Sequence, residues 1–111
     1  MISIDGLRDF GADADSALKR CMNNEEFYLK QVNKVLTGNS YDKIKEAVVN
    51  ADLDAAFEAA HALKGVLGNL GLTPLYEPVA EMTECLRSKT DKDYSAYIDV
   101  IEDRVNALNN M

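Results

Sequence analysis

The chain has 111 residues, of which 47% are hydrophobic, and this size and composition predict one globular domain over residues 1–111. The net charge of −7, with no cluster of Lys or Arg, argues against nucleic-acid binding, because a phosphate backbone would be repelled. The first residues lack a signal peptide's basic and apolar segments, and no apolar run is long enough to span a bilayer. We therefore expect a cytoplasmic protein with no membrane contact.

The first third of the chain carries the signals of two helices. Asp13 is placed to cap a helix that continues to Met22. Asn23, followed three residues later by Glu26, resembles a capping box and predicts the start of the next helix, which Gly38 would end. The two cysteines, Cys21 and Cys85, are far apart and lack metal-ligand spacing, so we expect free thiols that pack as small apolar residues.

The rest of the chain predicts four more helices. Ser40 and Asp52 are candidate caps for two of them, and the Thr73-Pro74 pair is a helix-start signal for another. Pro78 predicts either a kink in that helix or a later start. A last helix is expected to begin near Asp93. Short polar connections favour antiparallel neighbours, so the fold class is all-α: an up-down antiparallel four-helix bundle with an additional short N-terminal helix or helices.

The segment 52–71 is the most informative of these helices. At about 100° per residue, one side of it gathers an apolar stripe that must face the core. His61 points well away from the centre of this stripe, so we expect it to be exposed or at the stripe's edge. The stripe consists of Leu53, Phe57, Ala60, Leu63, Leu67 and Leu70.

The neighbours of His61 on its own face are unusual. Lys64 follows at i+3, Gly65 at i+4 and Gly68 at i+7. Each glycine inside a helix costs about 1 kcal/mol relative to alanine, so a gain must favour both. Bare backbone would let another protein approach the imidazole, and Lys64 would attract an anion bound to the imidazole. A neutral imidazole is also a good nucleophile near neutral pH. The alternative, non-functional explanations are a surface histidine without a role, a solvated lysine, and glycines that only allow close helix packing.

The segment AHALKGVLGNLG, residues 60–71, resembles the signature of histidine-containing phosphotransfer (HPt) domains. His61, Leu63, Lys64, Gly65, Gly68, Asn69 and Gly71 fill its key positions. Upstream, GLRDFGAD and ALKRCMNNEEFYLKQV resemble the N-terminal helices of this family. The resemblance extends over nearly the whole chain.

The resemblance implies a module of a two-component phosphorelay. His61 would be the phosphorylation site, Lys64 would stabilise the phosphoryl group, and Gly65 and Gly68 would give the partner room. The partner would be a response-regulator receiver domain, a hybrid sensor histidine kinase, or both. The receiver would supply the Asp acceptor, the catalysis and Mg²⁺, so the chain itself would be a phosphocarrier that has no cofactor, no kinase activity and a monomeric state.

Leu67 and Leu72 stand where relatives often have Ala, and Pro78 enters a helix that is usually continuous. Leu67 should alter packing more than phosphotransfer, whereas Pro78 could alter the shape of the docking face. Two other functions are considered. Glu58 and His61 match half of a di-iron motif, but the chain has one histidine and no second copy. A bundle that docks without being phosphorylated would normally have lost His61 or Lys64, and both are present.

Overall fold

The computed structural model describes residues 2–38, 40–90 and 92–110. These residues form helices and no strand, in agreement with the predicted all-α class. The helices are α1 (Ile4–Phe10), α2 (Ala14–Arg20), α3 (Glu25–Thr37), α4 (Ser40–Val49), α5 (Leu53–Asn69), α6 (Thr73–Arg87) and α7 (Ser95–Asn109).

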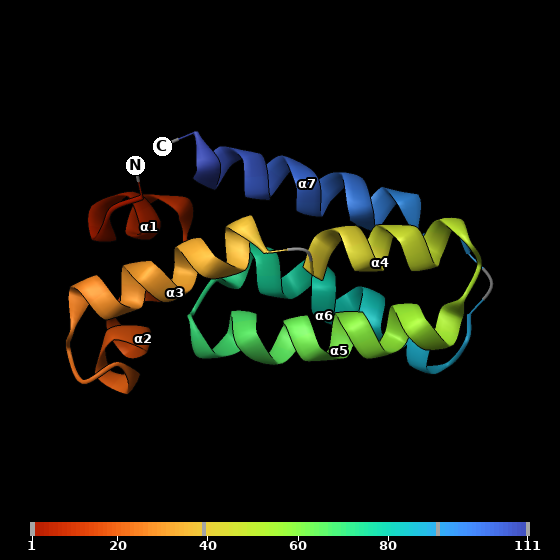
Figure 1. The fold of residues 1–111 in the computed structure, drawn as a ribbon, viewed down its shortest axis with the longest axis horizontal. Helices are drawn as coiled ribbons and strands as arrows, with labels where there is room; N and C mark the ends of the chain where they lie inside the picture. The colour runs from red at the N-terminus through yellow and green to blue at the C-terminus, as the bar shows by residue number, and fades with distance from the viewer. Residues whose placement is uncertain (1, 39, 91, 111) are drawn as a thin grey trace.

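The longer helices alternate in direction, as Figure 1 shows. Helices α3 and α4 follow one another along one side, α5 returns, α6 runs forward again, and α7 returns. The closest neighbours are α5 with α6, then α4 with α5 and α6 with α7. The short helices α1 and α2 lie at the end of the bundle where α3 begins. The predicted up-down bundle with short N-terminal helices is therefore confirmed, and its first rod is built from two helices laid end to end.

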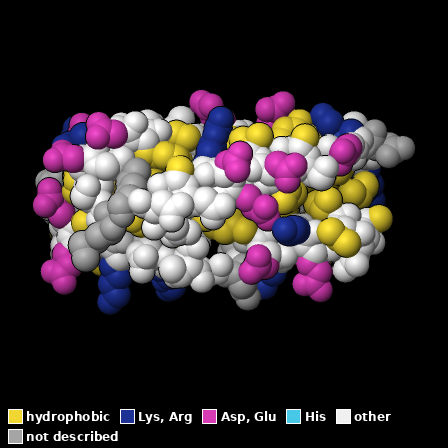
Figure 2. All heavy atoms as spheres, turned by 90° about the horizontal axis from the view of Figure 1, so that it is seen from above, with side chains coloured by type: hydrophobic (Ala, Val, Ile, Leu, Met, Phe, Trp, Pro, Cys, Tyr) yellow, Lys and Arg dark blue, Asp and Glu magenta, His cyan; other side chains and the backbone are white. Residues whose placement is uncertain are grey.

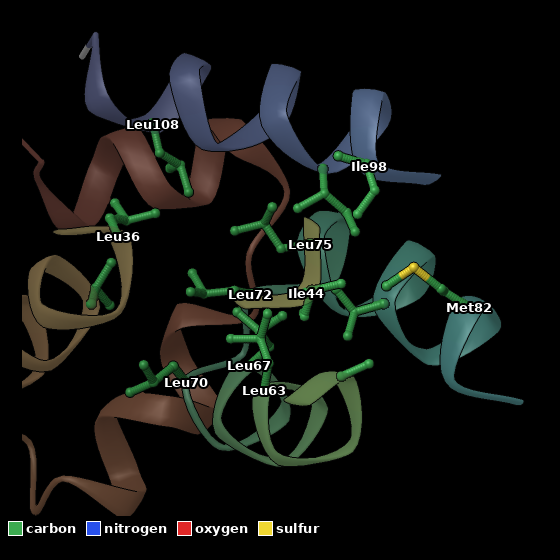
Figure 3. Packing of buried hydrophobic residues seen from close by; sticks show 14 of the residues in the cluster. Leu36, Ile44, Leu63, Leu67, Leu70, Leu72, Leu75, Met82, Ile98 and Leu108 are labelled. Carbon is green, nitrogen blue, oxygen red and sulfur yellow. The ribbon is translucent and has the colours of Figure 1, made fainter. Parts of the chain in front are cut away.

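The core lies between these rods, because each longer helix turns one apolar face inward. Figure 3 shows leucine, isoleucine and methionine side chains from α3 through α7 meeting in one cluster. Leu67, which was expected to affect packing, is fully buried in it, and so is Leu72. The largest fully buried side chains are Tyr28, Leu7, Ile44, Leu67, Leu72, Leu75, Met82, Leu86, Leu108, Val32, Val79 and Thr83. Burial of such side chains supplies the main driving force for folding.

Two predicted caps are confirmed and two need correction. The carboxylates of Asp13 and Asp52 accept hydrogen bonds from the first-turn amides of α2 and α5, at 3.3 and 3.1 Å. The cap of α3 is Asn24, not Asn23, because Asn23 has a φ of 60° whereas an N-cap needs an extended backbone. Ser40 is the first residue of α4 rather than its cap, and the preceding position lies outside the described residues.

Other helix ends differ by a residue or two from the sequence prediction. Helix α2 ends at Arg20, with Cys21 as its C-cap and a φ of 57° at Met22. Gly38 does follow the last residue of α3, but its backbone is extended rather than left-handed. Helix α7 begins at Ser95, where the Asp93 carboxylate accepts hydrogen bonds from the Ser95 amide and hydroxyl. Cys21 and Cys85 are free and only half-buried, rather than buried as predicted.

Pro78 lies inside α6 without ending it. Helix α6 starts at Thr73, as the Thr73-Pro74 signal predicts, and runs unbroken to Arg87, so the later start considered for it is wrong. Pro78 has no N–H to donate to the carbonyl of Pro74, one turn earlier. The guanidinium of Arg104 in α7 donates to that carbonyl instead. The proline thus creates an acceptor that joins α6 to α7.

Replacing Arg104 by methionine is expected to lower the free energy of unfolding by about 1–2 kcal/mol, because it leaves the Pro74 carbonyl without this donor. Urea unfolding followed by circular dichroism measures the change. Lys30→Met, at an exposed position of α3, is the matched control and should stay within about 0.5 kcal/mol of the parent. An Arg104→Met protein as stable as the parent would contradict this account of Pro78.

The surface on the side of α7 carries acidic and basic side chains interspersed with exposed hydrophobic atoms (Figure 2). No gathering of Lys and Arg is visible on this face, and the histidine is not seen on it. Among the described residues, no helix is both long and apolar enough to cross a membrane. The histidine therefore lies on another side of the bundle.

Candidate functional site

His61 lies at the midpoint of the 17-residue helix α5, and its side chain is exposed. Its position follows from the helical wheel, since Ala60, Leu63 and Leu67 are buried and fix the inward face of α5. The predicted exposure of the imidazole is thus confirmed. A protein that approaches this side of the bundle can reach the ring.

Phe57 lies one turn before His61 and was predicted to belong to the core stripe. It is instead half-buried at the stripe's edge, as is Leu53. The rings of Phe57 and His61 stack, with centroids 5.6 Å apart and planes 13° from parallel. The guanidinium carbon of Arg87, at the end of α6, lies 5.0 Å from the centre of the same phenyl ring. Phe57 therefore contacts both the imidazole and the guanidinium of Arg87.

Lys64 follows His61 by three residues and points toward α6. Its ammonium nitrogen lies 4.0 Å from Oε1 of Glu84, and the Nε of Arg87 lies 3.3 Å from Oε2 of the same carboxylate. One carboxylate thus contacts two cations beside the histidine. Neither Glu84 nor Arg87 was found by sequence reasoning, because their proximity to His61 depends on how α5 and α6 pack.

The glycines of the signature occupy three different environments. A Cβ built on Gly65 would meet nothing within 4 Å, so this position is open to solvent. A Cβ on Gly68 would lie 3.4 Å from the ring of Tyr76 in α6, an ordinary van der Waals contact. The predicted strip of bare backbone is therefore open at Gly65 and bordered by an aromatic ring at Gly68.

Gly71 serves the fold rather than access. Its φ is +67°, in the left-handed region, and a Cβ there would lie 2.4 Å from the carbonyl oxygen of Asp13. The Asp13 amide donates to the Gly71 carbonyl at 2.7 Å. Only glycine lets the loop between α1 and α2 pack this closely on the turn after α5.

The C-terminal end of α5 is held by the N-terminal part of the chain. Arg20 donates through Nη2 to the carbonyl of Gly68 at 3.2 Å and through Nε to that of Asn69 at 2.9 Å. The buried hydroxyl of Tyr28 donates to the carbonyl of Leu70 at 2.7 Å, and burial raises the pKa of Tyr28 to about 12. The last carbonyls of a helix have no intrahelical partner, and the charge of Arg20 suits the negative end of the helix dipole.

The flank of α5 that faces α3 and α4 borders a groove of about 620 Å³. Small and apolar side chains of α5 form its floor, among them Ala59, Ala62 and Val66, and the last of these is 42% exposed. Lys34 and Lys43 lie at its sides. The groove gives a partner apolar contact area on the helix that carries His61.

Glu58, which together with His61 matches half of a di-iron motif, is exposed on α5. Among the residues that the structure describes, no group of three or more His, Cys, Asp or Glu side chains could hold a metal ion. The neighbourhood of His61 is instead made of a phenyl ring, two cations, one carboxylate and open backbone.

This arrangement presents an exposed nucleophile with positive charge beside it, and one comparison agrees with it. A family model described as the Hpt domain matches residues 28–111. The chain belongs to the Hpt domain family. Hpt domains take part in histidine phosphotransfer in phosphorelays as phosphocarriers that interact with receiver domains and kinases. No curated protein and no solved structure matched the chain significantly.

The Hpt match covers α4 to α7 in full and most of α3, and so it contains the whole signature segment. Residues 1–27 lie outside it, although Asp13 and Arg20 make backbone contacts at the end of α5. Arg20 lies in the segment ALKRCMNNEEFYLKQV, which resembles the N-terminal helices of the family but had no role assigned to its residues. In this Hpt domain Arg20 donates hydrogen bonds to the carbonyls at the C-terminal end of the helix that carries His61.

Proposed function

We propose that His61 accepts a phosphoryl group from the aspartyl phosphate of a receiver domain and donates it to the Asp of a receiver domain. The observation that carries this proposal is an exposed imidazole at the midpoint of α5, next to Lys64 and to open backbone at Gly65. A nucleophile that must meet another protein's active site needs this exposure.

The transfer needs little from this chain beyond position and charge. An imidazole nitrogen of His61 attacks phosphorus, an N–P bond forms, and the P–O bond to the receiver's aspartate breaks, which leaves a free carboxylate on the receiver. The other ring nitrogen keeps its proton. Lys64 neutralises part of the charge on the transferred group, which is the main requirement of phosphoryl transfer. In this proposal Mg²⁺ and the catalytic groups belong to the receiver, and the chain has no cofactor of its own.

Three features support docking of a receiver domain or a hybrid sensor histidine kinase on this side of the bundle. Gly65 leaves the path to the imidazole free of a side chain. Gly68 leaves bare backbone as well, as far as the neighbouring ring of Tyr76. The groove along Ala59, Ala62 and Val66 offers apolar contact. We propose that the chain does this as a monomer, with no nucleic acid involved. The cytoplasmic location expected from the sequence stays a prediction.

The proposal is tested by incubating the protein with a receiver domain carrying a ³²P-labelled aspartyl phosphate. The parent should acquire a label that is lost in acid and kept in alkali, as expected for a phosphorus–nitrogen bond. His61→Gln should acquire none, because the acceptor atom is gone. Lys64→Ala should be labelled more slowly but still be labelled.

His61 is exposed, so its replacement should leave the circular dichroism spectrum and the unfolding midpoint close to those of the parent. A label that resists acid, or one that persists in folded His61→Gln, would defeat the proposal. A parent protein that binds the phosphorylated receiver yet never takes the label would instead be a docking module.

A further inference from the structure

Two cations lie beside His61, but each is already in contact with a carboxylate. Glu84 reaches Lys64 through one oxygen at 4.0 Å and Arg87 through the other at 3.3 Å. The side chains of Glu84 and Arg87 are 60% and 51% exposed, so both can change rotamer without disturbing the core. In the unmodified site the positive charge of the two cations is therefore partly neutralised by one carboxylate.

A phosphoryl group on His61 would change this balance. Such a group carries close to two negative charges at neutral pH and three acceptor oxygens. It repels the Glu84 carboxylate and attracts the same two cations that Glu84 contacts. A guanidinium is the better match of the two, because it can donate two parallel hydrogen bonds to phosphate oxygens.

Phe57 contacts both His61 and Arg87. The imidazole centroid and the guanidinium carbon lie 5.6 and 5.0 Å from the centre of one phenyl ring, so they are at most about 10.6 Å apart. A change of rotamer at the exposed Arg87 side chain can shorten this separation and bring its N–H groups toward the imidazole. The stacking holds the histidine in place while the arginine moves.

We infer that Arg87 is a second phosphoryl-binding cation, and that Glu84 pairs with Arg87 and Lys64 until the phosphoryl group displaces the Glu84 carboxylate. This inference rests on the proposed function, since it concerns the phosphorylated form of His61. It assigns Arg87 a direct contact with the phosphoryl group and Glu84 a positioning role through the two cations.

The test uses the protein phosphorylated by phosphoramidate, a small donor that loads histidine without a partner protein. The ³¹P chemical shift, followed against pH, gives the pKa of the phosphoryl group. The other charged groups near His61 are Glu58, and Asp54 with its partner Lys89 at 3.4 Å, and they are left unchanged in every variant. Arg87→Met keeps an apolar stem over Phe57 but removes the charge, and it should raise this pKa by about 0.5 pH unit.

The companion variants separate charge from packing. Arg87→Lys should stay near the parent because it keeps a cation. Glu84→Gln should shift the pKa in the opposite direction, downward, and this shift should shrink in an Arg87→Met background, since Glu84 acts through Arg87. Lys30→Met, which changes the net charge by the same amount at an exposed position of α3, should cause no shift.

The outcomes distinguish this inference from the proposed function. Failure of phosphoramidate to give an acid-labile, His61-dependent phosphoryl group would overturn both. Normal loading, with the same phosphoryl pKa in the parent and in Arg87→Met, would overturn only the role of Arg87. A Glu84→Gln shift of equal size with and without Arg87 would remove the positioning role of Glu84.

Discussion

Gly65→Gln is expected to slow phosphotransfer from a receiver domain by on the order of 100-fold while leaving the bundle folded. The added side chain has free space in the isolated protein, since a Cβ at this position meets nothing within 4 Å. It would occupy the surface one turn after His61, where the receiver must approach. Small displacements of reacting groups cost about this much in rate. Rapid-quench measurement of label transfer at several receiver concentrations gives the rate.

Stability should move in the other direction, because glutamine favours a helix over glycine by about 0.5–1 kcal/mol. Ala107→Gln, at an exposed position of α7, provides the control and should transfer at the parental rate. Loading of Gly65→Gln by phosphoramidate should remain normal, since that donor is small. Parental rates of transfer from the receiver to Gly65→Gln would show that open backbone at this position is not needed for docking.

Gly71→Ala is expected to destabilise the protein by about 3 kcal/mol. Two costs combine: a left-handed backbone that alanine resists, and a Cβ 2.4 Å from the Asp13 carbonyl oxygen. The contact is with backbone, so relief requires the loop between α1 and α2 to move away from the turn after α5. Thermal unfolding should show a midpoint lowered by roughly 10 °C or more.

Gly65→Ala is the matched comparison within the same motif and should stabilise the protein by about 1 kcal/mol. The two alanine variants thus separate a glycine kept for access from a glycine kept for folding. If Gly71→Ala unfolded at the parental temperature, the close packing of Asp13 on Gly71 would not contribute to stability.

The sequence predicts α5 and its chemistry well because the information is local. Asp52 caps the helix, the apolar positions recur at helical spacing, and His61 falls on the opposite face. The Thr73-Pro74 start of α6 is local in the same way. Helix periodicity and capping depend on residues a few positions apart, so they can be predicted from a single sequence.

The parts that the sequence did not predict depend on packing between distant segments. Phe57 is at the edge of the apolar stripe, and its contact with Arg87 depends on how α6 packs against α5. Glu84 is 20 residues from Lys64 in the chain, and no spacing rule connects them. Pro78 predicts a kink or a later start of α6, but its missing donor is replaced by Arg104 of α7.

Four successive carbonyls, from Gly68 to Gly71, accept hydrogen bonds from Arg20, Tyr28 and Asp13. The Hpt family match begins at Tyr28, so two of these three donors lie upstream of it. A fragment trimmed to the matched residues would retain the histidine, the lysine and every glycine of the signature. The carbonyls at the end of the signature helix would nevertheless lose the donors Arg20 and Asp13. The segment that the family model matches is therefore shorter than the segment whose residues hold the end of this helix.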